Sequence, residues 1–123
     1  SRMVKVQLLR KRLKPGRAGQ ARVLAGLIVG FKVEGHADFA EHGQDIVCAG
    51  VSALTQGALL GLRDVLGDKV SFRRQPGYLE VNVDLDEADA TAPRAILRTL
   101  ELGLLSIARA YSGHVDVTYQ DID

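Results

Sequence analysis

The amino-acid sequence predicts an α+β fold, in which two helices pack on one face of a mixed or antiparallel sheet. Five short segments alternate apolar and polar side chains or are rich in β-branched residues, as strands are. Two longer segments repeat apolar residues at three- and four-residue steps, as amphipathic helices do. Their order, ββαββαβ, is typical of an α+β sandwich. The length of 123 residues and the lack of a recognisable linker predict one domain over 1–123.

The first two strand-like segments predict a hairpin with a basic tip. Residues 3–9, MVKVQLL, alternate in the manner of a half-buried strand, and residues 21–35 are β-branched and long enough for a second strand. The Pro-Gly pair at 15–16 favours a turn between them. Residues 10–22 carry six positive charges and no acid, so the remainder of this +1 chain carries −5.

Two interpretations of the basic segment stay open. It can be a solvated hairpin tip that aids solubility, because it has no interleaved aromatic residues and no recognisable nucleic-acid motif. It can also bind RNA or an acidic surface. The candidate RNA contacts are Arg10, Lys11, Arg12, Lys14 and Arg17.

The other elements follow in order along the chain. We expect a helix that begins at Asp45 and ends at Gly67, then a second hairpin on either side of the turn at 75–77. A second helix is expected to open at Thr91, and residues 114–120 form a closing strand. The apolar stripe of the first helix is predicted to contain Val47, Val51, Leu54, Ala58, Leu62 and Val65.

Composition favours a soluble, cytoplasmic protein. The apolar runs look shorter than the ~20 residues of a membrane span, and no secretory signal is visible. A single cysteine cannot form a disulfide within the chain, which favours a reducing compartment. Ser1 and Arg2, ahead of Met3, resemble a cloning remnant. We therefore expect no membrane partner.

That cysteine, Cys48, lies near the expected start of the first helix. The partial positive charge of first-turn N–H groups favours the thiolate, which is the nucleophilic form, and the same groups could hold an oxyanion. Helical spacing places Cys48 on one polar edge of the apolar stripe with Ser52 and Thr55. The alternative is a structural thiol, because cysteine often behaves as a small buried hydrophobe.

A histidine and a carboxylate accompany the cysteine. His36, at the end of the second strand, could protonate a leaving amine. Asp45 could orient the imidazole or simply cap the helix, and Gly43 permits a tight loop turn or a close approach of substrate. A zinc site is disfavoured, because the CxxC or HxxxH spacing is missing; its ligands would be His36, His42, Cys48, Asp38 and Asp45. We expect no metal and no cofactor.

The stretch GHADFAEHGQDIVCAGVSALTQGALLGL resembles the signature of the Prp (YsxB-like) family of ribosomal-processing cysteine proteases. A Gly-His-Ala run at 35–37 and the segment GQDIVCAGVS at 43–52 stand at the separation found in that family. The resemblance continues through VLGDKV, PGYLEV and LRTLELGLLSIARAY, so it covers the chain from Gly35 to Tyr111.

The resemblance implies an endopeptidase that removes the short N-terminal extension of large-subunit ribosomal protein L twenty-seven, cutting after an aromatic pair and before a small residue. It implies Cys48 as nucleophile and His36 as base and acid, with Asp45, Ser52, Gly35 and Gly43 in support. It also implies a homodimer and a loop over 37–44 that is mobile until substrate binds. Two features depart from the family: Asp38 stands where glycine is common, and the basic segment is longer. The rival hypothesis is a non-catalytic ribosome- or RNA-associated module that uses the basic hairpin.

Overall fold

The computed structural model describes residues 3–11, 27–35, 42–85 and 90–122. These residues form five strands, two long helices and one short 3-10 helix. In chain order they are β1 (Val4–Lys11), β2 (Leu27–Glu34), α1 (His42–Leu66), η2 (Gly67–Lys69), β3 (Val70–Gln75), β4 (Tyr78–Val83), α2 (Thr91–Ala110) and β5 (Val115–Ile122). The predicted order ββαββαβ is confirmed.

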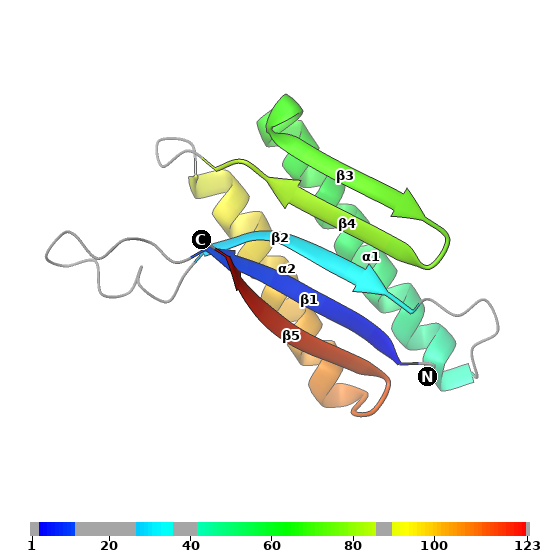
Figure 1. Cartoon of the computed structure of the whole chain (residues 1–123). Coiled ribbons are helices and arrows are strands. Elements are labelled where there is room, and N and C mark those ends of the chain that lie inside the picture. Colours follow the sequence, from blue (N-terminus) through cyan, green and yellow to red (C-terminus); the bar gives the residue numbers. More distant parts are fainter. Residues whose placement is uncertain (1–2, 12–26, 36–41, 86–89, 123) are drawn as a thin grey trace, which may run out of the picture.

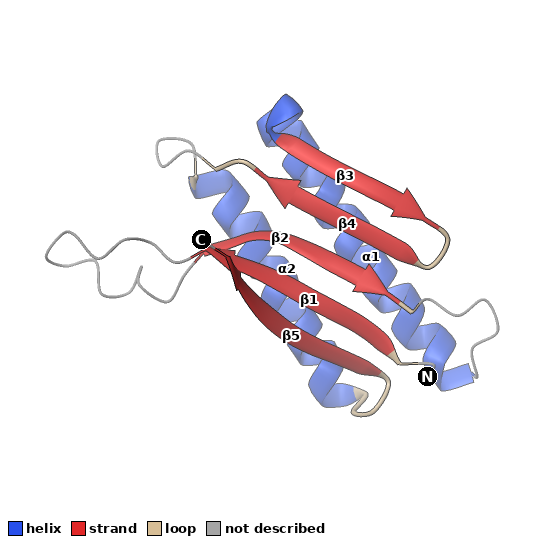
Figure 2. Ribbon diagram, in the orientation of Figure 1, coloured by secondary structure: helices blue, strands red, loops and turns tan. Residues whose placement is uncertain are grey.

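The strands form one mixed sheet in the spatial order β3-β4-β2-β1-β5. The β1–β5 pair is parallel, and the other three neighbouring pairs are antiparallel. Both helices lie behind the same face of this sheet, as Figures 1 and 2 show, with α1 behind the β3–β4 side and α2 behind the β1–β5 side. The predicted α+β fold is therefore confirmed.

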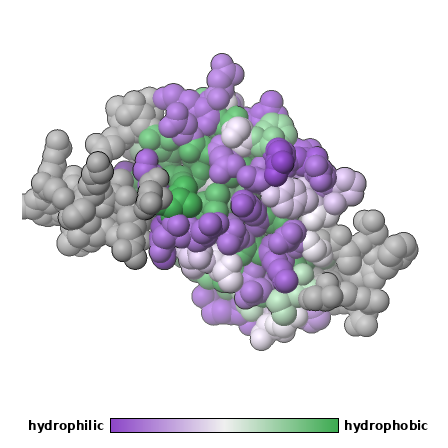
Figure 3. Space-filling view, in the orientation of Figure 1, coloured by the Kyte–Doolittle hydropathy of each residue, from purple (hydrophilic) through white to green (hydrophobic). Residues whose placement is uncertain are grey.

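The core lies between the helices and the inner face of the sheet. Alternate residues of β1, β2 and β4 are buried there, as the period of two requires. The largest of the buried side chains are Phe31, Leu8, Leu59, Leu62, Leu97, Leu100 and Leu104. Hydrophilic side chains predominate on the opposite face, which Figure 3 shows, although a hydrophobic area interrupts them. The period of two thus separates a buried face from a mostly polar one.

Most of the predicted stripe of α1 is buried, with one exception. Val47, Val51, Ala58 and Leu62 are buried, and Leu54 is partly buried against α2. Val65 remains 45% exposed, so its place in the stripe was predicted wrongly. The helices are antiparallel, since Leu54 meets Gly103 and Gly61 meets Ile96. The last turn of α1 therefore lies opposite the first turn of α2, where the interface ends.

Helix α1 begins at His42, three residues before the predicted start. Asp45 is therefore the fourth helical residue, so the alternative in which it caps the helix is wrong. An N-cap residue precedes the first helical residue, whereas Asp45 already belongs to the first turn. The predicted start differs because residue preferences locate a helix boundary only to within a few residues.

Part of α1 is long and apolar enough to span a membrane, although the apolar runs of the sequence look too short. The segment Ile46–Lys69 is long and apolar enough to cross a membrane by length and composition alone, with a mean hydropathy of 1.4. Core helices of soluble proteins can be equally long and apolar. Here the apolar character serves packing on two sides, because α1 contacts both the sheet and α2.

A carboxylate on the outer face of the sheet is expected to contribute to acid-sensitive stability. Glu80 accepts hydrogen bonds from the Tyr78 hydroxyl at 2.7 Å, from Arg73 at 3.0 Å and from Asn82 at 3.3 Å. These bonds, that from Tyr78 first, lower the pKa of Glu80 to about 2. The ionised form is thus favoured by folding, and its contribution is present above the ordinary pKa near 4.5 and lost as the pH falls toward 2.

We expect Glu80→Gln to lower the free energy of unfolding by about 1 kcal/mol at pH 7, as the loss of a charged hydrogen-bond acceptor does. The difference between variant and wild type should shrink between pH 4.5 and pH 2. Urea unfolding at several pH values measures both quantities. A difference that stays constant down to pH 2 contradicts this assignment.

Candidate active site

The strand that leads to the candidate histidine ends in a glycine that no other residue replaces easily. Gly35 follows β2 with φ +95°, and its N–H donates to the Gly77 carbonyl at 3.2 Å. A Cβ at this position would lie 2.6 Å from the Met3 carbonyl oxygen. The backbone is therefore held from both sides, by the β3–β4 turn and by the start of β1. His36 is the next residue and lies outside the described residues.

Cys48 is the seventh residue of α1, which places it in the second turn of the helix. The expectation of a cysteine within the first turn is therefore wrong, because the helix starts earlier than predicted. The backbone N–H groups that lack an intrahelical acceptor belong to the first four residues, one turn before Cys48. Helical side chains tilt toward the N-terminus, so the Cys48 side chain leans back toward this first turn. Cys48 is partly buried and packs at the margin of the core.

Cys48 shares one flank of α1 with Ser52, which lies one turn further along and is also partly buried. The same flank continues to Arg63, whose guanidinium carbon lies 5.0 Å from the centroid of the Phe72 ring on β3. The flank therefore faces the β3 side of the sheet, away from α2. This direction depends on strand order, which the sequence alone does not reveal.

Thr55 lies close to Cys48 in direction around the helix axis but is buried, so it adds nothing to an exposed polar edge. It is 1% exposed, and its hydroxyl donates to the Val51 carbonyl at 2.8 Å, one turn earlier in α1. The expected polar edge is thus smaller than predicted. A hydroxyl that is satisfied within its own helix can be buried among apolar side chains, which sequence polarity does not indicate.

The structure brings together only part of the predicted site. Cys48 lies in the N-terminal half of α1, and Figure 1 shows this half at the same end of the molecule as the end of β2. The side chain of His36 and those of residues 42–45, including Asp45, lie outside what the structure describes. Within the described residues, no group of three His, Cys, Asp or Glu side chains could hold a metal ion.

The start of the basic segment is held in an intramolecular cluster. Arg10 Nε donates to Asp121 Oδ1 at 2.6 Å, and its guanidinium carbon lies 4.8 Å from the centroid of the Tyr119 ring. Tyr119 in turn donates to Glu101, which also binds Arg98 at 2.8 Å. Burial, followed by the bond to Glu101, raises the pKa of Tyr119 to about 12, so this hydroxyl stays protonated.

These contacts change the prediction for RNA binding. Arg10 joins β1 to β5, and Lys11 at the end of β1 is exposed. Arg12, Lys14 and Arg17 lie outside the described residues. Of the five candidate contacts, Arg10 thus has a structural partner that competes with any RNA phosphate.

We expect Arg10→Ala to destabilise the fold by about 1 kcal/mol while leaving peptide cleavage unchanged. The ion pair is partly exposed, so its contribution is modest, and the ring contact adds a similar amount. Chemical unfolding and cleavage assays measure the two effects, with Lys11→Ala as the control that should alter neither. A fall in activity without a fall in stability contradicts the structural role.

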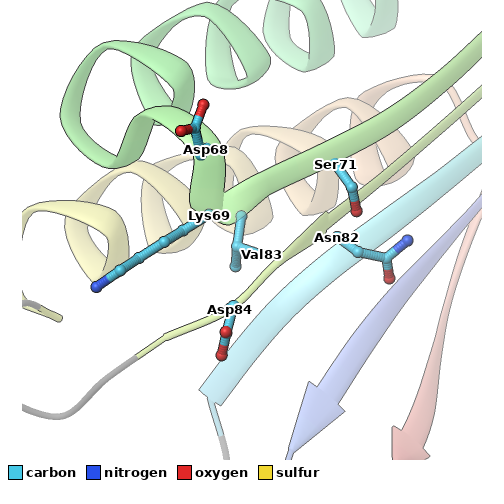
Figure 4. A pocket seen from close by; sticks show the side chains of 6 residues that line it. All are labelled: Asp68, Lys69, Ser71, Asn82, Val83 and Asp84. Carbon is cyan, nitrogen blue, oxygen red and sulfur yellow. The ribbon is translucent and has the colours of Figure 1, made fainter.

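A second polar feature lies at the other end of the β3–β4 hairpin. A hollow is lined there by Asp68, Lys69, Ser71, Asn82, Val83 and Asp84. Figure 4 shows the side chains of Asp68 and Asp84 pointing away from each other. The hollow lies beside the C-terminal end of α1, whereas Cys48 lies in its N-terminal half. It therefore does not contribute to a site around the cysteine.

Comparisons with known proteins show the family of this chain and agree with its fold. The family model described as cysteine protease Prp matches residues 20–116, well over half of the chain. The chain belongs to the Prp family of cysteine proteases. The ribosomal processing cysteine protease Prp of Bacillus subtilis is 34% identical over 95 residues, which cover 74% of this chain and 85% of that protein. Its counterpart in Staphylococcus aureus is 31% identical over 99 residues, 77% of this chain and 90% of that protein.

Solved structures share the Prp fold. A protein of Streptococcus mutans superimposes with a TM-score of 0.76 at 20% identity, covering 98% of this chain and 96% of that one. The Staphylococcus aureus protease Prp in complex with a substrate peptide gives a TM-score of 0.70 at 20% identity, over 94% of this chain and 99% of that one. Membership of the family makes this chain a cysteine peptidase.

Proposed function

We propose that this Prp-family chain is the endopeptidase that removes the short N-terminal extension of a large-subunit ribosomal protein, with Cys48 as its nucleophile. One observation carries the proposal: a cysteine peptidase needs a cysteine, and this sequence contains only one. The relatives' designation as ribosomal processing proteases, and the peptide bound to one of them, support the substrate class.

His36 is the proposed acid and base. Gly35 holds the backbone directly before it, through the bond to Gly77 and the close approach to Met3. Because the strand end is fixed, a histidine attached to it can stay at a constant distance from a thiol on the helix. Asp45 and Ser52 are proposed to support the pair. Gly43 is the second residue of α1, so a tight loop turn at this position is excluded, and we propose that it lets a substrate backbone approach closely.

The proposed reaction is acyl transfer. The Cys48 thiol gives its proton to His36, and the resulting thiolate attacks the scissile carbonyl carbon, so that a C–S bond forms and the carbonyl oxygen becomes an oxyanion. We propose that the open N–H groups of the first turn of α1 stabilise this oxyanion, since the Cys48 side chain leans toward them. The C–N bond then breaks as His36 donates a proton to the leaving amine. A water molecule gives a proton to His36 and attacks the thioester, which releases the new carboxylate and restores the thiolate.

The proposal also includes the substrate, the oligomeric state and the cellular compartment. The substrate is a ribosomal protein precursor, the protein is a cytoplasmic homodimer, and no cofactor takes part. Contact with RNA through Lys11, Arg12, Lys14 and Arg17 remains a prediction. The rival hypothesis of a non-catalytic module is set aside, because the chain belongs to a family of proteases.

The test combines labelling with cleavage. Purified protein is incubated with iodoacetamide, the modified residue is located by mass spectrometry, and the remaining activity is followed with a precursor of the host's ribosomal protein. We expect activity to fall in proportion to the alkylation of Cys48, and the untreated enzyme to release one short N-terminal peptide. Full activity after complete alkylation would overturn the assignment of Cys48 as the nucleophile. A lack of cleavage by the untreated enzyme would overturn the assignment of the ribosomal protein precursor as the substrate.

A further inference from the structure

Strand β3 lies at one edge of the sheet, and within the described residues it pairs only with β4. The Asp84 N–H donates to the Lys69 carbonyl at 2.9 Å, which identifies these two opposite residues as a hydrogen-bonded pair. Backbone groups alternate in direction along a strand, so those of Ser71 and Arg73 point toward β4. Those of Phe72 and Arg74 point away from the sheet. Two consecutive sets of N–H and C=O groups are thus presented along the outer side of β3.

Charged side chains shield this edge of the sheet only in part. Edge strands are commonly protected by charges, and Arg73 and Arg74 could serve this purpose. Arg73, however, donates to Glu80 on the neighbouring strand and lies on the outer face. Phe72 is 38% exposed, with the guanidinium carbons of Arg63 and Arg74 at 5.0 and 5.7 Å from its ring centroid. The edge therefore carries an apolar ring between two positive charges.

This edge adjoins the flank of α1 that carries Cys48. Phe72 pairs with Val81, which is fully buried, so Phe72 projects to the helix side of the sheet and meets Arg63 there. Strand β3 returns antiparallel to α1, as Figure 1 shows. A chain that follows β3 from Phe72 toward Gln75 therefore advances toward the N-terminal half of α1.

The distances suit a short peptide. Cys48 precedes Arg63 by about 22 Å along the helix axis, at 1.5 Å per residue. The three steps from Phe72 to Gln75 span about 10 Å. The remaining gap of about 12 Å equals roughly four extended residues. A peptide paired with Phe72 and Arg74 therefore needs about four further residues to cover this distance along the helix axis.

We propose that the open edge of β3 binds the peptide substrate as an added strand, through the backbone of Phe72 and Arg74, and so guides the scissile bond to Cys48. The inference rests on the proposed function, since it concerns a segment of the same substrate. Pairing of an extended peptide with an exposed sheet edge supplies affinity through main-chain hydrogen bonds. Arg63 and Arg74 add a preference for carboxylate side chains in the paired segment.

The test uses a variant that removes one outward N–H and keeps the ladder to β4. Arg74→Pro deletes an N–H that points away from the sheet, a position at which edge strands tolerate proline. Arg74→Ala is the matched control, because it removes the same side chain and keeps the N–H. The substrates are two nested peptide series that are lengthened from the scissile bond on one side or on the other, up to eight residues.

For wild type, we expect lengthening beyond about four residues on one side to raise kcat/KM, mainly through a lower KM. Arg74→Pro should reduce this gain about fivefold relative to Arg74→Ala, the effect of one hydrogen bond. Short peptides should be cleaved equally by both variants, which shows that both fold. A glutamate in the paired segment should be favoured over a lysine by wild type and less so by Arg74→Ala.

Equal kcat/KM of the two variants on every long peptide would overturn the proposal, as would the absence of any gain with length on either side. Both outcomes differ from failure of the proposed function, in which the wild type cleaves neither short nor long peptides of this substrate.

Discussion

Replacing Cys48 with alanine is expected to abolish peptide cleavage, with a loss of ~10⁴-fold or more, as removal of a catalytic nucleophile does. The fold should survive, because Cys48 is only partly buried at the margin of the core and alanine suits a helix. Single-turnover cleavage assays and thermal unfolding measure the two effects.

His36→Ala gives the companion result. It should lose nearly as much activity, and the double variant should lose no more than either single one, because the two groups act as a unit. Substantial activity in Cys48→Ala would require another nucleophile and remove the mechanism. Substantial activity in His36→Ala alone would assign the proton transfer to another group while leaving Cys48 in place.

Gly35→Ala is expected to destabilise the fold by about 3 kcal/mol, from overpacking and backbone strain together, and to impair cleavage as well. The new Cβ would lie 2.6 Å from the Met3 carbonyl oxygen, a backbone atom that cannot move without shifting β1. The residue also has φ +95°, which adds strain for any side chain. Any relaxation displaces the end of β2 and, with it, the attachment of His36.

Gly57→Ala is the matched control. Gly57 lies in α1 with nothing within 4 Å of the position that a Cβ would take. Alanine there should stabilise the protein by up to about 1 kcal/mol through helix propensity, and leave cleavage unchanged. Urea unfolding of both variants distinguishes the two glycines. Wild-type stability in Gly35→Ala would show that the end of β2 adapts and is no rigid attachment.

The local elements could be predicted because each has its own pattern. Alternation along residues 78–85 predicts strand β4, and the Pro-Gly pair before it predicts the turn that the structure contains. Propensity located the start of α1 three residues late, since helix boundaries depend on caps and contacts that a residue type indicates only loosely. The burial of Thr55 was not predicted, because residue polarity does not reveal that its hydroxyl finds a partner within the helix.

The sequence alone determined the order of strands and helices, the single thiol, and the resemblance to a protease family. These features are local: periodicity, residue identity and the spacing of a motif. The tertiary structure decided that Gly35 is wedged against Met3, that Arg10 is held by Asp121, and that β3 is an edge beside the flank of Cys48. Each of these depends on which strands become neighbours. That choice is made by packing between residues distant in sequence, and no local pattern records it.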